Sequence, residues 1–180
     1  MKQTLTGLAL LLGIAVMARS TTASMITFTA SLDGAQQVPS NMSTATGSGT
    51  VVLDDVADTI TVDLSFSGLT GGPATAAHIH GPGAAGTNAP IIFPFTGVPA
   101  ATSGVIPEQM FSITPTQITE LEAGLFYMNI HNASFPSGEI RGQLTQVPEP
   151  GTLTLLGLGA FGLAFSKGRK AHSSPARRMT

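Results

Sequence analysis

Three histidines are the residues of this sequence best suited to chemistry. His78 and His80 lie two positions apart, and His131 lies about fifty residues further along the chain. Residues i and i+2 of a strand share one face and lie about 6.5–7 Å apart, so on a strand His78 and His80 would point to the same side. If His131 lies on a neighbouring strand, three imidazoles can converge on one ion beneath the long loop 81–99.

The residues around His131 indicate which way it points. His131 alternates with Asn129 and Tyr127 along the segment 126–131. The opposite face carries three apolar side chains: Phe126, Met128 and Ile130. Because the apolar face must pack on the core, His131 is expected on the outer face.

Two interpretations of these histidines remain open. Three neutral imidazoles suit Cu(II) or Zn(II), and an open fourth position would permit chemistry. Alternatively, the rings hydrogen-bond to loop carbonyls near Pro82 and Pro136 and hold the architecture. The fourth histidine, His172, lies near the C-terminal end of the chain, outside the predicted domain.

The elements that must position these side chains are mostly strands. Segment 59–67 alternates apolar and polar residues strictly, which is typical of a half-buried antiparallel strand. Further strands are predicted at 26–31, 49–53, 74–80, 125–131 and 139–145, with a weaker one at 105–113. Thr114, Pro115 and Gln117 predict the start of one short helix, 115–123, and Gly124 its end. This pattern favours an all-β fold, an antiparallel Greek-key-type sandwich or flattened barrel.

Both ends of the chain are apolar and differ from the middle. Residues 1–24 place Lys2 before an apolar run and small residues, the order of a secretory signal peptide. Residues 147–180 hold an apolar stretch, 152–166, followed by a basic tail, 167–180. That stretch is shorter than a stable membrane-spanning helix. We therefore expect an N-terminal and a C-terminal apolar helix around one domain, 25–146.

The predicted domain is strongly acidic. Residues 25–146 contain nine acids and a single cation, Arg141, which gives a formal charge of −8. Proteins that bind nucleic acids contact phosphates chiefly through Lys and Arg, so nucleic acid is not an expected partner. The chain has no cysteine, which excludes disulfides and thiol chemistry.

Two further segments contain charged residues whose roles can be predicted: 139–143 and 54–58. Glu139, Arg141 and Gln143 alternate on one predicted strand face. The alternatives are a solvated rim, a pairing of Glu139 and Arg141 with each other or with a turn, and neutralisation of a carboxylate cluster by Arg141. An acidic segment with Asp54, Asp55 and Asp58 predicts a hairpin turn, with weak calcium binding as the alternative. No nucleophile elbow and no phosphate-binding loop occurs in the sequence, so we expect no enzymatic activity.

The middle of the chain resembles a CHRD (chordin-type) domain over residues 26–146. The resemblance rests on Phe28 to Pro39, on His-Ile-His-Gly-Pro at 78–82 and on Gly-Glu-Ile-Arg-Gly-Gln at 138–143. Its motif residues in this chain are Gly81, Pro82, Gly138, Glu139, Arg141 and Gly142. The resemblance implies an extracellular β domain without established catalysis. The His-x-His element is also similar to the copper strand of Cu/Zn superoxide dismutases. The expected fold is a sandwich that is dismutase-like or immunoglobulin-like.

The end of the chain resembles a PEP-CTERM sorting signal. It has Val147, Pro148, Glu149 and Pro150, then the apolar stretch and the basic tail, in that order. The resemblance implies export, removal of the leader by signal peptidase, membrane contact through the C-terminal stretch, and processing by an exosortase. It places the protein at a bacterial cell surface or in the extracellular matrix, with envelope or matrix components as partners. Two functions follow as hypotheses: a non-catalytic structural or binding protein, or a copper- or zinc-binding metalloprotein that serves redox chemistry or metal storage.

Overall fold

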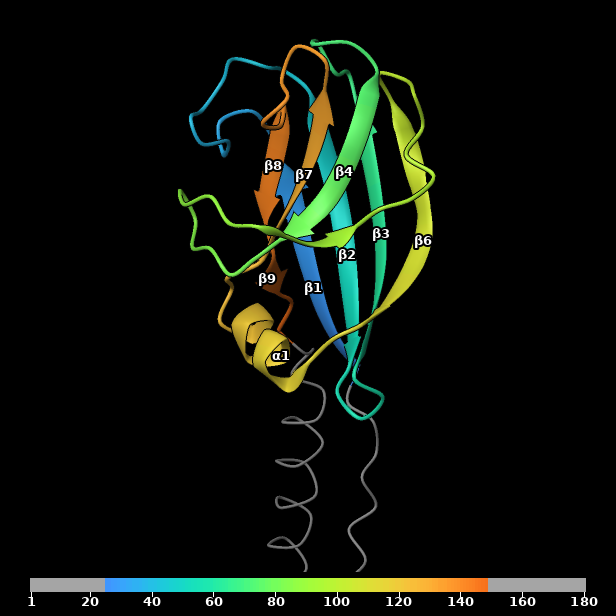
Figure 1. The fold of residues 1–180 in the computed structure, drawn as a ribbon, viewed down its shortest axis with the longest axis vertical. Coiled ribbons are helices and arrows are strands. Elements are labelled where there is room, and N and C mark those ends of the chain that lie inside the picture. The colour runs from blue at the N-terminus through green and yellow to red at the C-terminus, as the bar shows by residue number, and fades with distance from the viewer. Residues whose placement is uncertain (1–24, 149–180) are drawn as a thin grey trace, which may run out of the picture.

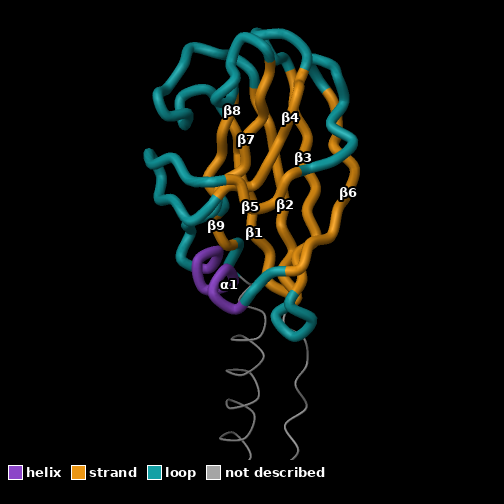
Figure 2. The backbone as a smooth tube through the Cα atoms, viewed as in Figure 1, coloured by secondary structure: helices purple, strands orange, loops and turns teal. Residues whose placement is uncertain are grey.

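The computed structural model describes residues 25–148, which fold into two packed antiparallel sheets (Figures 1 and 2). One sheet has five strands in the order β6-β3-β2-β1-β9, and the other has four in the order β5-β4-β7-β8. The elements are β1 (Met25–Leu32), β2 (Thr46–Asp54), β3 (Thr59–Ser67), β4 (Ala74–His80), β5 (Ile91–Pro94), β6 (Gly104–Ser112), α1 (Pro115–Glu122), β7 (Tyr127–Asn132), β8 (Ile140–Gln143) and β9 (Thr145–Gln146). The predicted all-β sandwich with one short helix is confirmed.

The alternating pattern of β3 shows how the core forms. Its apolar residues Ile60, Val62, Leu64 and Phe66 are at most 4% exposed, while Asp63 is exposed. β3 is central in its sheet, paired with β2 on one side and β6 on the other. Its inward side chains therefore meet those of the facing sheet, and burial of this apolar surface stabilises the sandwich.

The four-stranded sheet carries the histidine segments. β4 pairs with β7 in an antiparallel register that sets His78 opposite Asn129 and His80 opposite Tyr127. On the other side of β4 lies β5, a short edge strand inside the segment expected to be one long loop. That expectation was wrong for residues 91–94, because Phe93 is buried in the core and its backbone pairs with Ile79. Residues 81–90 alone form the connecting loop.

The strand predicted at 139–145 is divided between the two sheets. β8 pairs with β7 in one sheet, and β9 pairs with β1 in the other. The division occurs at Leu144, which is fully buried and whose N–H donates to Phe126 O. The single predicted strand was therefore wrong, because the chain changes sheets where Leu144 enters the core.

The predicted short helix is present as α1 and lies at one end of the sandwich (Figure 1). The Thr114 side chain accepts from Gln117 N–H, and the Gln117 side chain accepts from Thr114 N–H, so both arms of the capping box are present. Gly124 has φ +71°, the left-handed conformation that ends helices. The helix fixes where the chain enters β7.

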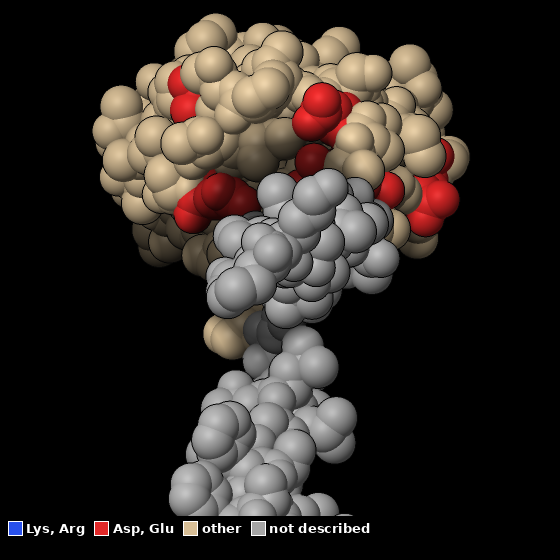
Figure 3. All heavy atoms as spheres, turned by 90° about the horizontal axis from the view of Figure 1, so that it is seen from below, with Lys and Arg blue, Asp and Glu red and all other residues tan. Residues whose placement is uncertain are grey.

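The two ends of the described segment lie side by side. β9 pairs with β1 through Phe28↔Gln146 and Thr29↔Thr145, and Val147 N–H donates to Thr27 O. Figure 1 shows the chain entering and leaving at the same end of the sandwich. Seen from that end, the uncovered surface shows acidic side chains and no Lys or Arg (Figure 3).

The predicted signal peptide, both apolar helices, the basic tail, and Glu149 and Pro150 lie outside the described residues. Within 25–148, no helix is long and apolar enough to span a membrane.

Asp54 lies at the β2–β3 hairpin, where its Oδ1 accepts from the N–H groups of Val56 and Ala57. The hairpin turn that was predicted at this acidic segment is therefore present.

Candidate metal centre

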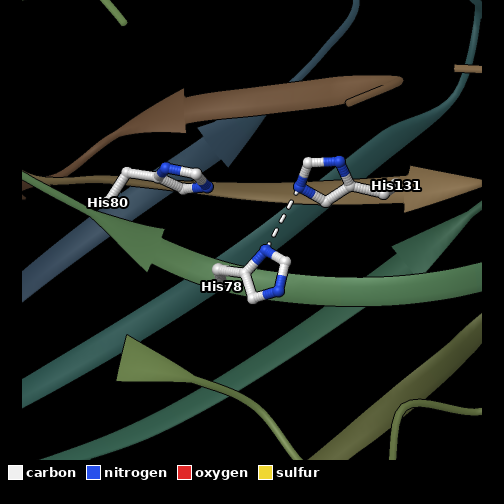
Figure 4. Close-up of side chains that lie close together, drawn as sticks. All are labelled: His78, His80 and His131. Carbon is white, nitrogen blue, oxygen red and sulfur yellow. Dashed lines mark hydrogen bonds between the residues drawn. The ribbon is translucent and has the colours of Figure 1, made fainter. Parts of the chain in front are cut away.

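The backbone register of β4 and β7 brings the three predicted histidines together on the outer face of the four-stranded sheet. His131 pairs with Ala76 across the ladder, and His78 lies diagonally from it, two residues along β4. Ala77, Ile79 and Ile130, on the alternate positions, are fully buried in the core. Figure 4 shows His78 and His80 rising from β4 and His131 from β7, with their rings turned toward one another.

The imidazoles are close enough to form one cluster. One ring nitrogen from each of His78, His80 and His131 can be chosen so that all three lie within 4.8 Å of one another. The closest pair is His78 Nδ1 and His131 Nε2, at 3.2 Å. The ring centroids of His80 lie 5.6 Å from those of His78 and 6.2 Å from those of His131. Nitrogen ligands of a tetrahedral zinc ion lie about 3.4 Å apart, so the His80 ring must turn inward to complete a site.

Two backbone carbonyls decide which ring nitrogens are free. His80 Nδ1 lies 2.9 Å from Ala89 O, and His131 Nδ1 lies 2.9 Å from Pro136 O. A carbonyl oxygen only accepts, so both Nδ1 atoms carry the proton and donate. In the neutral rings, the Nε2 atoms therefore hold the lone pairs and face the cluster. Metal-binding histidines are oriented in this way by outer hydrogen bonds.

Asn129 lies between these two lone pairs. Its Oδ1 is 3.1 Å from His80 Nε2 and 2.8 Å from His131 Nε2. Its side chain is 3% exposed. An oxygen facing two nitrogen lone pairs is unfavourable unless a proton or a cation lies between them, or the amide turns its N–H₂ group toward the rings. The centre of the cluster is thus rich in acceptors.

The pKa values favour the neutral, ligand-ready form of all three rings. Burial, together with the smaller effects of the nearby His131 and His80, lowers the pKa of His78 to about 4. Burial also lowers the pKa of His80, against the raising effect of its hydrogen bonds to Ala89 and Asn129. For His131, burial again outweighs the hydrogen bond to Pro136. The site therefore stays deprotonated below the pH at which free histidines take up protons.

The alternative role that the sequence left open has support as well. The carbonyls that accept from the rings belong to the loop 81–90 and to the turn after β7, as the structural interpretation expected. His78 Nδ1–H can donate to His131 Nε2. The rings thus tie two connections to the sheet even without a metal ion.

Three neighbours of the site were given no role from the sequence, although Tyr127 and Asn129 were expected on the same face as His131. Tyr127 stacks on His80 at 4.9 Å with the rings nearly parallel, and its hydroxyl accepts from Ala89 N–H. Asn129 is the second, and Ala89, which anchors His80, is the third. The i±2 alternation that places Tyr127 and Asn129 beside His131 was a usable signal for the first two, whereas Ala89 comes from a loop.

Glu139 is fully buried, so the solvated rim was wrong for this residue. Its Oε1 accepts from the Thr70 N–H and hydroxyl at 2.6 and 2.7 Å and from the Ser43 hydroxyl. Its Oε2 accepts from Gly71 N–H at 3.1 Å and from Asn132 Nδ2. Burial raises the pKa of Glu139, but these hydrogen bonds outweigh it and lower the pKa overall. Glu139 therefore joins two loops to the end of β7.

Arg141 is 1% exposed, so a solvated rim was also wrong there. Within residues 25–148 it pairs neither with Glu139 nor with a cluster of carboxylates. Its Nη2 instead donates to Ala84 O and Gln143 Oε1, and its Cζ lies 3.4 Å from the centre of the Tyr127 ring. Glu139 precedes β8, and its carboxylate is hydrogen-bonded by residues of the β1–β2 and β3–β4 connections and by Asn132.

Three glycines of the CHRD-like motifs, Gly81, Gly138 and Gly142, allow close packing or a turn that a side chain would hinder. A Cβ on Gly142 would lie 2.5 Å from Ser31 O, so β8 can approach β1 only without a side chain there. Gly138 has φ +116°, a conformation that favours glycine, in the turn before β8. A Cβ on Gly81, before the cis Pro82 peptide, would collide with the Phe126 ring.

Comparison with known proteins agrees with the fold and the motifs. The family model of the CHRD domain matches residues 28–144, and that of the PEP-CTERM protein-sorting motif matches residues 146–170. No curated protein and no solved structure matches the chain. The sorting motif implies processing by an exosortase and export to the cell surface or the extracellular space. The chain belongs to the CHRD domain family and carries a PEP-CTERM sorting motif at its C-terminal end.

Proposed function

We propose that the CHRD domain of this exported protein binds one transition-metal ion, copper(II) or zinc(II), through His78, His80 and His131. In this proposal the protein is a non-catalytic metal-binding component of the cell surface or the extracellular matrix. The observation that carries it is the convergence of three ring nitrogens within 4.8 Å, with the opposite nitrogens of His80 and His131 anchored on carbonyls.

The donor set supports copper or zinc over harder cations. Imidazole nitrogen suits Zn(II) and Cu(II), whereas Ca²⁺ and Mg²⁺ prefer oxygen ligands. Three histidines leave a fourth position for water, or for Asn129 Oδ1, which lies within 3.1 Å of two of the ring nitrogens. Lowered histidine pKa values support the same proposal, because ligand nitrogens must lose their protons before they bind a metal.

Calorimetric titration of the purified full-length chain with Zn²⁺ and Cu²⁺ tests the site. We expect one ion per chain, with affinity lowered at least about a hundredfold in His80→Ala and in His131→Ala, since each removes one of three ligands. His172→Ala is the matched control, because it removes the histidine outside the domain and should leave binding unchanged. The proposal is contradicted if the wild-type protein binds no ion. It is also contradicted if His80→Ala or His131→Ala binds the ion as tightly as the wild type does.

A purely structural role is the second candidate, favoured by the hydrogen bonds that each ring already makes. In that case His131→Ala destabilises the metal-free protein, and neither metal changes the melting temperature of the wild type. A bound metal would instead raise the melting temperature of the wild type with metal concentration and leave that of His131→Ala unchanged. The two candidates thus differ in one thermal-shift series.

The proposal includes the route of export. Residues 1–24 would be removed by signal peptidase, and the stretch 152–166 would hold the chain at the membrane until the exosortase acts. Support comes from the order of charge and apolar residues at each end and from the sorting motif at 146–170. After processing, envelope or matrix components are the expected partners.

A further inference from the structure

Arg141 is a buried cation, and within residues 25–148 its contacts are with uncharged groups. Its side chain is 1% exposed, and its Nη2 donates to Ala84 O at 3.3 Å and Gln143 Oε1 at 3.2 Å. The Tyr127 ring covers the guanidinium at 3.4 Å. Burial of an ion costs several kcal/mol unless a charge of opposite sign and full hydrogen bonding offset it. These contacts supply neither, although the domain contains nine acids.

The second terminal nitrogen of the Arg141 guanidinium, Nη1, lacks a hydrogen-bond acceptor in the described part of the chain. Nη1 of Arg141 is buried and has no hydrogen-bond partner within residues 25–148. The same holds for Nε2 of Gln37, whose side chain is 6% exposed. Each of these two atoms can only donate a hydrogen bond. What is missing at both positions is therefore an acceptor.

A cavity of about 150 Å³ has both of these residues in its lining. It is lined by residues 35–38 of the β1–β2 connection, by residues 85–86 of the β4–β5 connection, and by Arg141 and Gln143 of β8. Both connections project on the same side of the sandwich, beside β8 (Figure 1). The volume exceeds what one water molecule occupies, so a small organic ion fits.

We propose that this cavity binds a small carboxylate, held by Nη1 of Arg141 and the amide of Gln37. A carboxylate supplies the charge and the acceptor oxygens that both groups lack. A singly charged group matches one guanidinium, whereas a phosphate dianion would leave excess negative charge in a domain that already carries −8. Ala35, Val38 and Ala85 would contact the carbon atoms of the ligand.

Two sources present this chemistry outside a cell: a free small organic acid, or the carboxylate of an acidic sugar in a polymer. The probes are therefore acetate and trigalacturonate, with galactose as the uncharged comparison. Each is titrated by calorimetry into the full-length protein. We expect acetate to bind one to one in the millimolar range. Trigalacturonate binding with at least equal affinity identifies a polymer end, and its failure to bind identifies a free acid.

Two substitutions in the β4–β5 connection form a matched pair. Ala85 lines the cavity and Thr87 does not, and both are exposed, so neither change disturbs the core. Ala85→Phe is expected to weaken acetate binding at least about tenfold by filling the cavity, and Thr87→Phe to leave it unchanged. Arg141→Met is expected to abolish binding, and Ala85→Phe keeps the test valid should Arg141→Met fail to fold. Absence of acetate binding, or equal binding by wild type and Ala85→Phe, overturns the proposal.

This site is separate from the metal centre and its test does not depend on it. His78→Ala should remove metal and leave acetate binding within about twofold, because His78 does not line the cavity. If acetate binding is lost in His78→Ala, the acetate binds to a metal ion held by the histidines. That result would overturn the assignment of the acetate site to Arg141.

Discussion

Acidification is the most informative perturbation of the metal centre, because protons and the metal compete for the same nitrogens. A ring with the ordinary pKa of 6.5 is about 97% protonated at about pH 5, which weakens its metal binding about thirtyfold relative to about pH 7.5. Three such rings would weaken it about 30,000-fold. The pKa of His78, lowered to about 4, leaves that ring about 90% neutral at the same pH.

The structure therefore predicts a much shallower dependence on pH. His78 contributes almost nothing, and solvent screening at this half-buried ring would raise its share to no more than a few-fold. His80 and His131 each contribute less than about thirtyfold, since burial lowers both pKa values. Together the loss between about pH 7.5 and about pH 5 should stay near or below a thousandfold.

Competition titration with a zinc chelator of known proton affinity measures this loss at both pH values. Circular dichroism of the metal-free protein at about pH 5 serves as the folding control. The sign for stability follows from the same pKa values: the folded rings resist protonation, so the metal-free protein loses stability as the pH falls from about 6.5 toward the folded pKa values. A loss of affinity of about 10,000-fold or more in folded protein would refute the desolvation argument.

Three further predictions concern the framework and the tail. Glu139→Gln should lower the free energy of unfolding by about 2–6 kcal/mol, because the new amide nitrogen would face the two donors Gly71 N–H and Asn132 Nδ2. Chemical denaturation measures this loss, with Glu108→Gln as the control at an exposed site. Equal losses in the two variants would contradict the prediction. Gly142→Ala should cost about 1–3 kcal/mol through the contact with Ser31 O, and an unchanged urea midpoint would show that β8 can shift. Mass spectrometry of the exported protein should show a C-terminus upstream of Thr180, and an intact tail would argue against exosortase processing.

Local alternation was enough to predict most strands but not the change of sheet. In β3, every second residue is apolar and every one of them is buried, so the pattern and the structure coincide. Residues 91–94 follow a Gly- and Pro-rich stretch and form only a short edge strand, which period-2 alternation cannot reveal. The division at Leu144 depends on where the facing sheet lies, which is a long-range property of the fold.

The histidine cluster was predictable because it depends on two simple rules. Alternation placed His78 and His80 on one face, and antiparallel neighbours brought His131 beside them. The buried state of Glu139 and Arg141 was not predictable, because loops distant in sequence cover both side chains. Charge alone suggested a solvated rim, and most of the hydrogen bonds that make burial tolerable come from residues about 60 to 100 positions away.

The pairing of β1 with β9 has a consequence for how this domain can be combined with others. Its first and last strands are direct neighbours, so the described segment begins and ends almost at one point. A unit of this kind can be spliced into a surface loop of a host protein without stretching the host chain. It can equally stand at the end of a linker as a single pendant unit. In either arrangement the histidine face, built on the other sheet, stays clear of the attachment point.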